Sequence, residues 1–253
     1  METSTPGATP SDVKVLIGIP TYNGDVASEV IDDLFHCSKD TPFTFCRQGG
    51  SLLAMGFNNL LCEALNHRKL GITHFVLHHA DIGLEPQWLD KMMSIYKEKD
   101  ADILSVVIPI KNEEGLTSTA LDEDIEGRSK DACPRRLTMH EIFRDFPRTF
   151  TAPNLLLNTG VMMFALDKPW LEGMCFRMED RIIQNQDGKY LASTMPEDWL
   201  FSRDARRRGA TKLYATREVG ATHFGRAMYP NTQEWGTSWQ DAVKKEDRKK
   251  KPF

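Results

Sequence analysis

THFVLHHADIG, residues Thr73 to Gly83, is an apolar run that ends in polar residues. Phe75, Val76 and Leu77 are consecutive apolar residues, as expected for a strand that is buried on both faces. Two histidines, an alanine and Asp81 then follow. Polar side chains are ordinary at a strand end, but two imidazoles and a carboxylate are also metal ligands. The rest of the chain has to distinguish these two interpretations.

Apolar runs of this kind alternate with amphipathic segments through the first half of the chain. Short apolar runs occupy residues 13–20, 42–48, 72–80 and 101–110. Between them, apolar residues recur at helical spacing in segments 25–37, 49–71 and 85–100. Strands that alternate with helices predict an α/β fold with a mainly parallel, twisted sheet flanked by helices. A single domain is expected over residues 13–230.

Three segments are expected to lie outside this regular core. Residues 1–12 are rich in Ser, Thr and Pro and predict a flexible leader. Residues 111–150 are polar and lack a clear period, which predicts a flexible insertion or flap. Residues 231–253 form a C-terminal tail with six basic residues among the eight of Lys244–Lys251. A solvated, disordered end is one interpretation of this basic tail, and contact with a polyanion or a membrane surface is the other.

The overall composition excludes several classes of protein. The formal net charge of -4 gives no global electrostatic case for binding nucleic acid or an anionic membrane. None of the five cysteines has CxxC spacing, which favours free thiols in a reducing compartment. The chain begins without the features of a signal peptide and has no apolar run long enough to cross a membrane. A cytoplasmic protein without a transmembrane segment is therefore predicted.

The polar end of the opening stretch is the first candidate for a metal site. Mn²⁺ and Mg²⁺ prefer carboxylate oxygens, such as those of Asp81, and Mn²⁺ also accepts imidazole. Side chains alternate along a strand, so His79 is expected on the same side as Asp81 and His78 on the opposite side. Histidines at strand ends also serve as packing residues, so this stretch alone leaves both interpretations open.

The turn PTYNG, residues 20–24, ends the first apolar run in the same way. Ligands of parallel sheets bind beyond the carboxyl ends of the strands, so this turn and HHADIG can face one crevice. There Tyr22 could stack on a nucleobase while Thr21 bonds its edge. A plain turn formed by Asn23 and Gly24 is the alternative.

Two later segments add a possible base and a possible second ligand. PEDWLFSRDARRRG, residues 196–209, begins a predicted helix with Glu197 and Asp198. Acids there stabilise the helix dipole, but one can also take a proton from an acceptor hydroxyl. His223, in GATHFG, is either a structural residue or the partner of Asp81 in an ion site. The oxygens of a diphosphate would then complete the coordination of the ion. The ion in such a site would assist departure of the diphosphate.

In this order the segments resemble nucleotide-sugar glycosyltransferases of the GT-A fold, close to the family 2 type. VLIGIPTYNG is similar to the opening strand and nucleotide-contacting turn of that family. HFVLHHADIGLEPQWLDKM is similar to the strand with the Asp-x-Asp metal motif, and LNTGVMMFAL to the strand on the acceptor side. PEDWLFSRDARRRG and GATHFG resemble the Glu-Asp helix and the late metal-binding histidine. The resemblance covers about Val13 to Gly225 and implies a Rossmann-like GT-A domain.

The resemblance also implies a role for each matching position. Asp81 and His223 would ligate Mn²⁺ or Mg²⁺. Asp198 would be the catalytic base, with Glu197 beside it or in contact with the acceptor. Contacts to the nucleotide sugar would come from Pro20, Thr21, Tyr22, Asn23 and Asn58.

Two departures from the family pattern change these expectations. His79 stands where the family has the first acid of Asp-x-Asp, so it would either ligate the metal or contact the donor, without adding negative charge. FCRQGGS replaces the usual Asp-Asp-Gly-Ser run after the second strand. Arg47, Gln48 or Ser51 would then recognise the nucleotide.

The resulting hypothesis is a metal-dependent glycosyltransferase that moves a sugar from a nucleoside-diphosphate sugar, such as a UDP- or GDP-sugar, to an acceptor hydroxyl. The acceptor could be a glycan, a lipid carrier, a protein or a modified nucleic acid base. A nucleotidyltransferase on a related fold is an alternative, although the first strand lacks a Gly-rich phosphate loop. A non-catalytic nucleotide-sugar binding protein, whose altered metal motif marks lost activity, is another.

Overall fold

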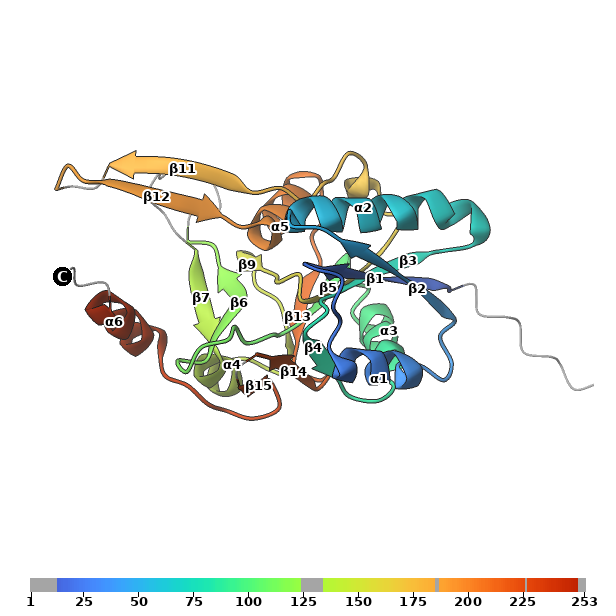
Figure 1. Cartoon of the computed structure of the whole chain (residues 1–253), viewed down its shortest axis with the longest axis horizontal. Helices are drawn as coiled ribbons and strands as arrows, with labels where there is room; N and C mark the ends of the chain where they lie inside the picture. Colours follow the sequence, from blue (N-terminus) through green and yellow to red (C-terminus); the bar gives the residue numbers. More distant parts are fainter. Residues whose placement is uncertain (1–12, 124–133, 185–186, 226, 250–253) are drawn as a thin grey trace, which may run out of the picture.

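The central sheet is built around the apolar run at Val15, which forms β1 (Val15–Thr21) in the computed structural model of the chain. The structure describes residues 13–123, 134–184, 187–225 and 227–249. Over these residues, seven strands form one sheet in the order β2-β1-β3-β10-β5-β13-β8 (Figure 1). The other six strands are β2 (Phe43–Gly49), β3 (His74–His78), β5 (Ile103–Val106), β8 (Thr149–Phe150), β10 (Val161–Ala165) and β13 (Leu213–Thr216).

Most strands of this sheet run in one direction. β1 is parallel to β2 and β3, and β13 is parallel to β5. β10 is antiparallel to both β3 and β5, which therefore share a direction, and β8 is antiparallel to β13. The predicted mainly parallel α/β sheet is confirmed, and the four predicted apolar runs form β1, β2, β3 and β5.

Helices cover both faces of the sheet, because its strands are apolar on both sides (Figure 1). α2 (Leu53–Asn66) packs on one face, and α1 (Ser28–His36) with α3 (Trp88–Glu98) lies on the other. Alternate residues of β1 and β3 enter the two cores. The core on the α2 side contains Leu16, Phe57, Leu60, Phe75 and Leu77. The core on the α1 and α3 side contains Val15, Ile17, Leu34, Val76, Trp88 and Met92.

Much of the segment expected to form a flap has regular structure. β6 (Leu116–Leu121), β7 (Arg135–Thr138) and β9 (Leu155–Leu156) form a small antiparallel sheet in the order β7-β6-β9. α4 (Met139–Asp145) follows β7 and begins with a capping box between Thr138 and Glu141. The expectation of a flap over 111–150 is therefore corrected for these parts. The strands are too short for a visible period in the sequence, and 124–133 lie outside the described residues.

The C-terminal segment returns to the domain instead of leaving it. β14 (Ala221–Phe224) and β15 (Met228–Pro230) form a sheet with β4 (Ile82–Leu84). Backbone of Glu114 and Gly115 packs so closely on Gly236 that a Cβ there would lie 2.2 Å from the Glu114 carbonyl oxygen. α6 (Trp239–Lys249) then forms within the basic tail, so the interpretation as a disordered end is wrong for the described residues, and the predicted contact with a polyanion or a membrane surface stays a prediction. The predicted leader, 1–12, lies outside the described residues.

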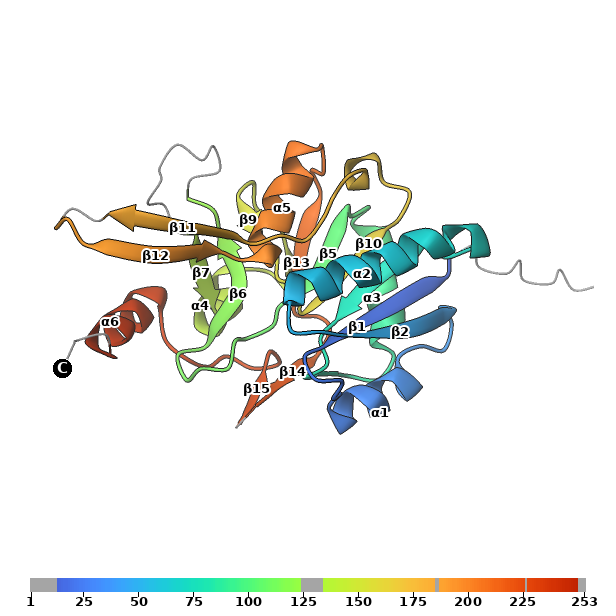
Figure 2. The same cartoon turned by 45° about the horizontal axis from the view of Figure 1, so that its top comes forward.

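A two-stranded ribbon extends away from the central sheet, toward the same end of the molecule as α6 (Figure 2). It consists of β11 (Glu179–Gln184) and β12 (Tyr190–Met195), which follow the short helix η2 (Pro169–Leu171) and precede α5 (Glu197–Arg207). Another short helix, η1 (His67–Leu70), lies between α2 and β3. None of the helices within the described residues is both long enough and apolar enough to cross a bilayer.

Candidate active site

Four of the predicted site residues line one cavity beyond the carboxyl end of β3. His79 follows β3, Glu197 and Asp198 begin α5, and His223 comes from β14. The cavity has a volume of about 130 Å³, smaller than the roughly 300 Å³ or more of a typical ligand pocket. It is therefore large enough for the reacting end of a ligand, and not for a whole nucleotide sugar.

Pairing between β4 and β14 places His223 beside Asp81. His223 is in register with Ile82, and the Phe224 amide donates to the Asp81 carbonyl over 2.8 Å. The side chains then meet with His223 Nε2 3.3 Å from Asp81 Oδ2. These residues are distant in sequence, and the fold brings their side chains together.

The hydrogen bond on the far side of the His223 ring prepares it for binding a cation. Nδ1 lies 2.8 Å from the Pro109 carbonyl oxygen, so this nitrogen carries the proton and donates. In the neutral ring Nε2 then has the lone pair and faces Asp81, which is the arrangement of a metal-binding histidine. In the charged ring Nε2 would instead donate to the carboxylate.

Asp81 is held in its charged form although it is partly buried. Burial opposes ionisation, but hydrogen bonds from His223 and Lys111 outweigh it and lower the pKa of Asp81 well below its usual value. Lys111 Nζ lies 2.5 Å from Oδ2, the same oxygen that faces His223. Lys111 belongs to the segment predicted to be a flap, and no spacing in the sequence connects it with Asp81.

A divalent ion fits this arrangement only with help from a ligand. Asp81 and His223 supply an oxygen and a nitrogen donor, a combination that suits Mn²⁺ better than Mg²⁺. Among the described residues, no group of three His, Cys, Asp or Glu side chains lies close enough together to hold an ion. Further ligands, such as diphosphate oxygens, would have to complete the coordination.

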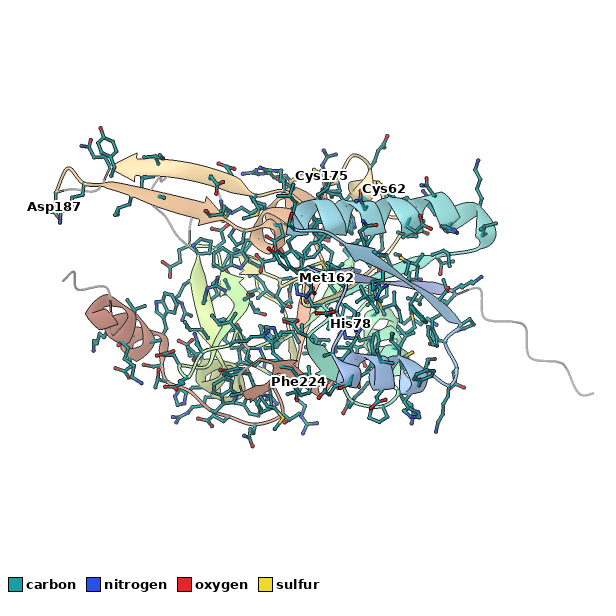
Figure 3. All side chains as sticks on the ribbon, viewed as in Figure 1. Cys62, His78, Met162, Cys175, Asp187 and Phe224 are labelled. Atoms are coloured by element: carbon teal, nitrogen blue, oxygen red, sulfur yellow. The ribbon has the colours of Figure 1, made fainter. Side chains whose placement is uncertain are left out.

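His79 and His78 separate as the alternation of side chains predicts. His78 is fully buried in the interior, donates from Nε2 to the Ile82 carbonyl over 2.8 Å and packs on Trp88 (Figure 3). His79 lines the cavity, and its Nε2 is buried without a hydrogen-bond partner among the described residues. Burial lowers the pKa of His79 to about 4, so its ring is neutral and can accept a hydrogen bond or ligate a metal. An unpartnered buried nitrogen in a cavity is a contact available to a ligand.

The two acids of α5 are buried at the wall of the cavity. Asp198 accepts a hydrogen bond from the Trp199 amide over 2.8 Å. Burial, followed by repulsion from Glu197, raises the pKa of Asp198 to about 8. Burial also raises the pKa of Glu197. A carboxyl group with a pKa near neutrality is a suitable general base, because it exists in both forms at working pH.

Residues of the small antiparallel sheet complete this wall, and the sequence did not identify them. Arg136 on β7 donates to Ser118 Oγ over 3.2 Å and lies 4.6 Å above the Trp199 ring. Its charge partly offsets the raised pKa of Asp198. Trp199 Nε1 donates to the Ser118 carbonyl over 2.7 Å, which fixes α5 against β6. These residues come from a segment without hydrophobic period, so only the folded chain brings them to the acids.

The candidates for nucleotide binding lie at the ends of β1 and β2. Thr21 pairs in register with Gly49, and Arg47 donates from Nη1 to the Gly24 carbonyl over 2.9 Å. Tyr22 is 77% exposed, which leaves its ring free to stack on a base. Pro20 is buried, whereas Asn23 and Ser51 are exposed. All of these lie outside the lining of the cavity at Asp198.

Asn58 does not join this group. Its Nδ2 donates to the Phe176 carbonyl over 2.8 Å, and its Oδ1 accepts from the Phe176 amide over 2.7 Å. Both polar atoms of the side chain therefore connect α2 to the segment before β11. These bonds give Asn58 a structural role, and its contact with the nucleotide sugar stays a prediction.

Comparison with known proteins supports the fold and leaves the activity open. No family model and no curated protein matches the chain. The crystal structure of A197 from STIV is 14% identical with a TM-score of 0.52, over 89% of this chain and 94% of that one. S. aureus TarS 1-349 is 10% identical with a TM-score of 0.38, over 81% of this chain and 58% of that one. A putative glucose-1-phosphate thymidylyltransferase from Bacillus anthracis is 9% identical with a TM-score of 0.37, over 83% and 89%. The likeness to A197 shows a shared fold alone, and TM-scores below 0.5 do not establish even that.

Proposed function

We propose that this chain is a glycosyltransferase that uses a nucleoside-diphosphate sugar. One observation carries the proposal: the pair of Asp81 with His223 and the buried Asp198 come from distant parts of the sequence to the same end of the sheet. The first pair suits a cation on a diphosphate, and Asp198 suits removal of a proton.

In the proposed reaction, the acceptor hydroxyl enters the cavity beside Asp198. Its oxygen forms a bond to the anomeric carbon of the donor sugar while the bond from that carbon to the diphosphate breaks. The hydroxyl proton passes to an Asp198 carboxylate oxygen, and the nucleoside diphosphate leaves. Glu197 raises the proton affinity of Asp198 through its neighbouring charge.

Asp81 and His223 would hold Mn²⁺ at the diphosphate, with His79 as a further contact through Nε2. The ion, when bound, would neutralise charge that develops on the leaving diphosphate. The exposed ring of Tyr22 and the neighbouring side chain of Arg47 would bind the nucleoside at the ends of β1 and β2.

A donor screen tests the proposal most directly. UDP-, GDP-, CDP- and dTDP-sugars are added with and without Mn²⁺, and the melting temperature and the released nucleotide are measured. A bound donor raises the melting temperature by mass action, and transfer or hydrolysis releases a nucleoside diphosphate. Release of pyrophosphate would instead indicate a nucleotidyltransferase, and binding without turnover over a panel of acceptors would indicate a binding protein.

Two variants separate the proposed roles. Asp198→Asn is expected to lower kcat by about 100-fold or more, the range for loss of a general base, while the donor Kd changes less than about twofold. Asp40→Asn, in an exposed turn before β2 at the opposite end of the sheet, is the matched control and should leave kcat unchanged. An Asp198→Asn protein with wild-type kcat would contradict the assignment of the base.

A further inference from the structure

The cation site at Asp81 already contains a positive charge from the chain itself. Lys111 Nζ and His223 Nε2 both approach Oδ2 of Asp81, at 2.5 and 3.3 Å. A divalent ion held between Asp81 and His223 would lie against this same oxygen, because Oδ2 is the carboxylate atom that faces the histidine. The ammonium group and the ion would therefore compete for the same position on the carboxylate.

The backbone around Lys111 holds the ammonium group in this place. The Ile110 amide donates to the Leu116 carbonyl over 2.8 Å, and the Leu116 amide donates to Asn112 Oδ1 over 3.2 Å, so residues 110–116 form a closed turn. Pro109, which accepts the bond from His223, begins the same turn. Lys111 and the histidine ligand are thus positioned by one piece of backbone.

The stem of Lys111 is also packed, although its end is near solvent. It crosses Gly225 so closely that a Cβ at this glycine would lie 2.8 Å from Lys111 Cδ. Gly225 follows β14, the strand that carries His223. Hence the lysine lies between two elements of the site instead of extending freely into water.

We propose that Lys111 is a tethered cation that occupies the Asp81 site until a ligand displaces it, which weakens binding of a divalent ion to the ligand-free protein. The inference rests on the proposed function for the identity of the ligand, a nucleoside diphosphate. Its phosphate oxygens give the ammonium group a new partner, so that Asp81 becomes free as the ion arrives. The ion and the nucleotide then bind together. Until both are present, Asp81 stays paired with Lys111.

The expected size of the effect follows from the fraction of molecules with a free carboxylate. If the lysine leaves Asp81 in one molecule in ten, the apparent affinity for the ion falls by about tenfold. Repulsion between the ammonium group and the ion adds to this reduction. Removal of the charge at residue 111 should therefore tighten ion binding by about tenfold or more.

The test is a titration of the full chain with Mn²⁺ alone, followed by the electron paramagnetic resonance signal of the free ion. Lys111→Met should bind Mn²⁺ at least about tenfold more tightly than the wild type, and Lys111→Arg, which keeps the charge, should stay within about threefold of it. Lys212→Met removes a charge at the other end of the sheet, where Lys212 pairs with Asp100, and should have no effect. Asp81→Asn in the Lys111→Met background should abolish the tight site.

Equal Mn²⁺ affinity in the wild type and Lys111→Met would overturn the proposal, as would weaker or undetectable binding by the variant. Melting curves of each variant verify that it is folded, which is expected because Lys111 and Asp81 are about 40% exposed. No donor sugar is present, so the titration is independent of sugar transfer. If no donor sugar binds in the screen, tenfold tighter binding of Mn²⁺ by Lys111→Met would still support the role of Lys111. If the titration shows no difference in Mn²⁺ affinity, the proposed role of Asp198 as the base is unaffected.

Discussion

Replacing Asp198 by Asn should make the protein more stable at neutral pH while it lowers activity. Asparagine has nearly the same shape, and its amide oxygen can still accept the hydrogen bond from the Trp199 amide. The substitution removes the need to ionise a carboxyl group that is 7% exposed and lies beside Glu197. A buried charge without a close counter-charge is costly, so its removal stabilises the native state.

The magnitude follows from the difference between the native and unfolded pKa. The native carboxyl keeps its proton up to about pH 8, whereas the ordinary pKa of an aspartate, as in an unfolded chain, is 3.8. Between these values the native state binds one more proton, so its stability falls as pH rises by about 1.4 kcal/mol per pH unit. At pH 7 the wild type therefore carries a penalty of about 4 kcal/mol that the asparagine variant lacks.

Urea unfolding at pH 5, 7 and 8.5 measures this penalty. The stability advantage of Asp198→Asn should be about 1.5 kcal/mol at pH 5, about 4 kcal/mol at pH 7 and constant above about pH 8. Asp40→Asn, which changes an exposed acid, should track the wild type at each pH. If the variant is no more stable than the wild type at pH 7, or the advantage does not grow with pH, Asp198 is already ionised in the folded protein and the reasoning fails.

Three further substitutions test other contacts. Asn58→Ala should lower the free energy of unfolding in urea by about 2 kcal/mol, because it removes two hydrogen bonds to Phe176. Its donor affinity should stay unchanged. A loss of donor affinity without a loss of stability would instead indicate that Asn58 contacts the nucleotide sugar. Asp122→Asn should lower the free energy of unfolding by about 3–5 kcal/mol, because it leaves the buried Arg203 charge without its bidentate partner. If the free energy of unfolding falls by less than about 1 kcal/mol, another group neutralises Arg203. Tyr22→Ala should change stability by less than about 0.5 kcal/mol but weaken donor binding in calorimetry by about fivefold or more; unchanged binding would exclude stacking on the base.

The sheet could be predicted from the sequence because its strands are short runs of consecutive apolar residues. Val15–Thr21 and His74–His78 are buried almost throughout, and no periodicity other than a continuous run fits that burial. The antiparallel strand β10 was also expected as a strand from LNTGVMMFAL. The antiparallel direction of β10 could not be predicted, because an apolar run has the same composition in either direction.

The candidate site was predictable only in part, because its members differ in how locally they are determined. Glu197 and Asp198 begin a helix that the sequence marks with Pro196, and Asp81 follows a strand, so their positions follow from local signals. Lys111 and Arg136 reach the site through tertiary packing of short strands and turns, for which hydrophobic period gives no signal. Asn58 is the opposite case: its place on α2 was clear, but the bonds that occupy its amide come from a segment 118 residues away.

The two principal aspartates differ in environment in a way that separates their proposed roles. Asp81 lies near the surface between Lys111 and His223, which lower its pKa and keep it anionic, as a ligand for a cation must be. Asp198 is buried in the wall of the cavity, where burial raises its pKa towards neutrality, as a group that accepts and returns a proton requires. Exchange of these environments would leave a neutral acid at the cation site and a permanently ionised, weak base at the hydroxyl. A pH profile of kcat/KM should therefore rise with an apparent pKa near 8 and lose this limb in Asp198→Asn, because Asp198 has to be ionised before it can accept a proton. If kcat/KM is constant from pH 6 to 9, Asp198 takes no part in proton transfer and has only a structural role in α5.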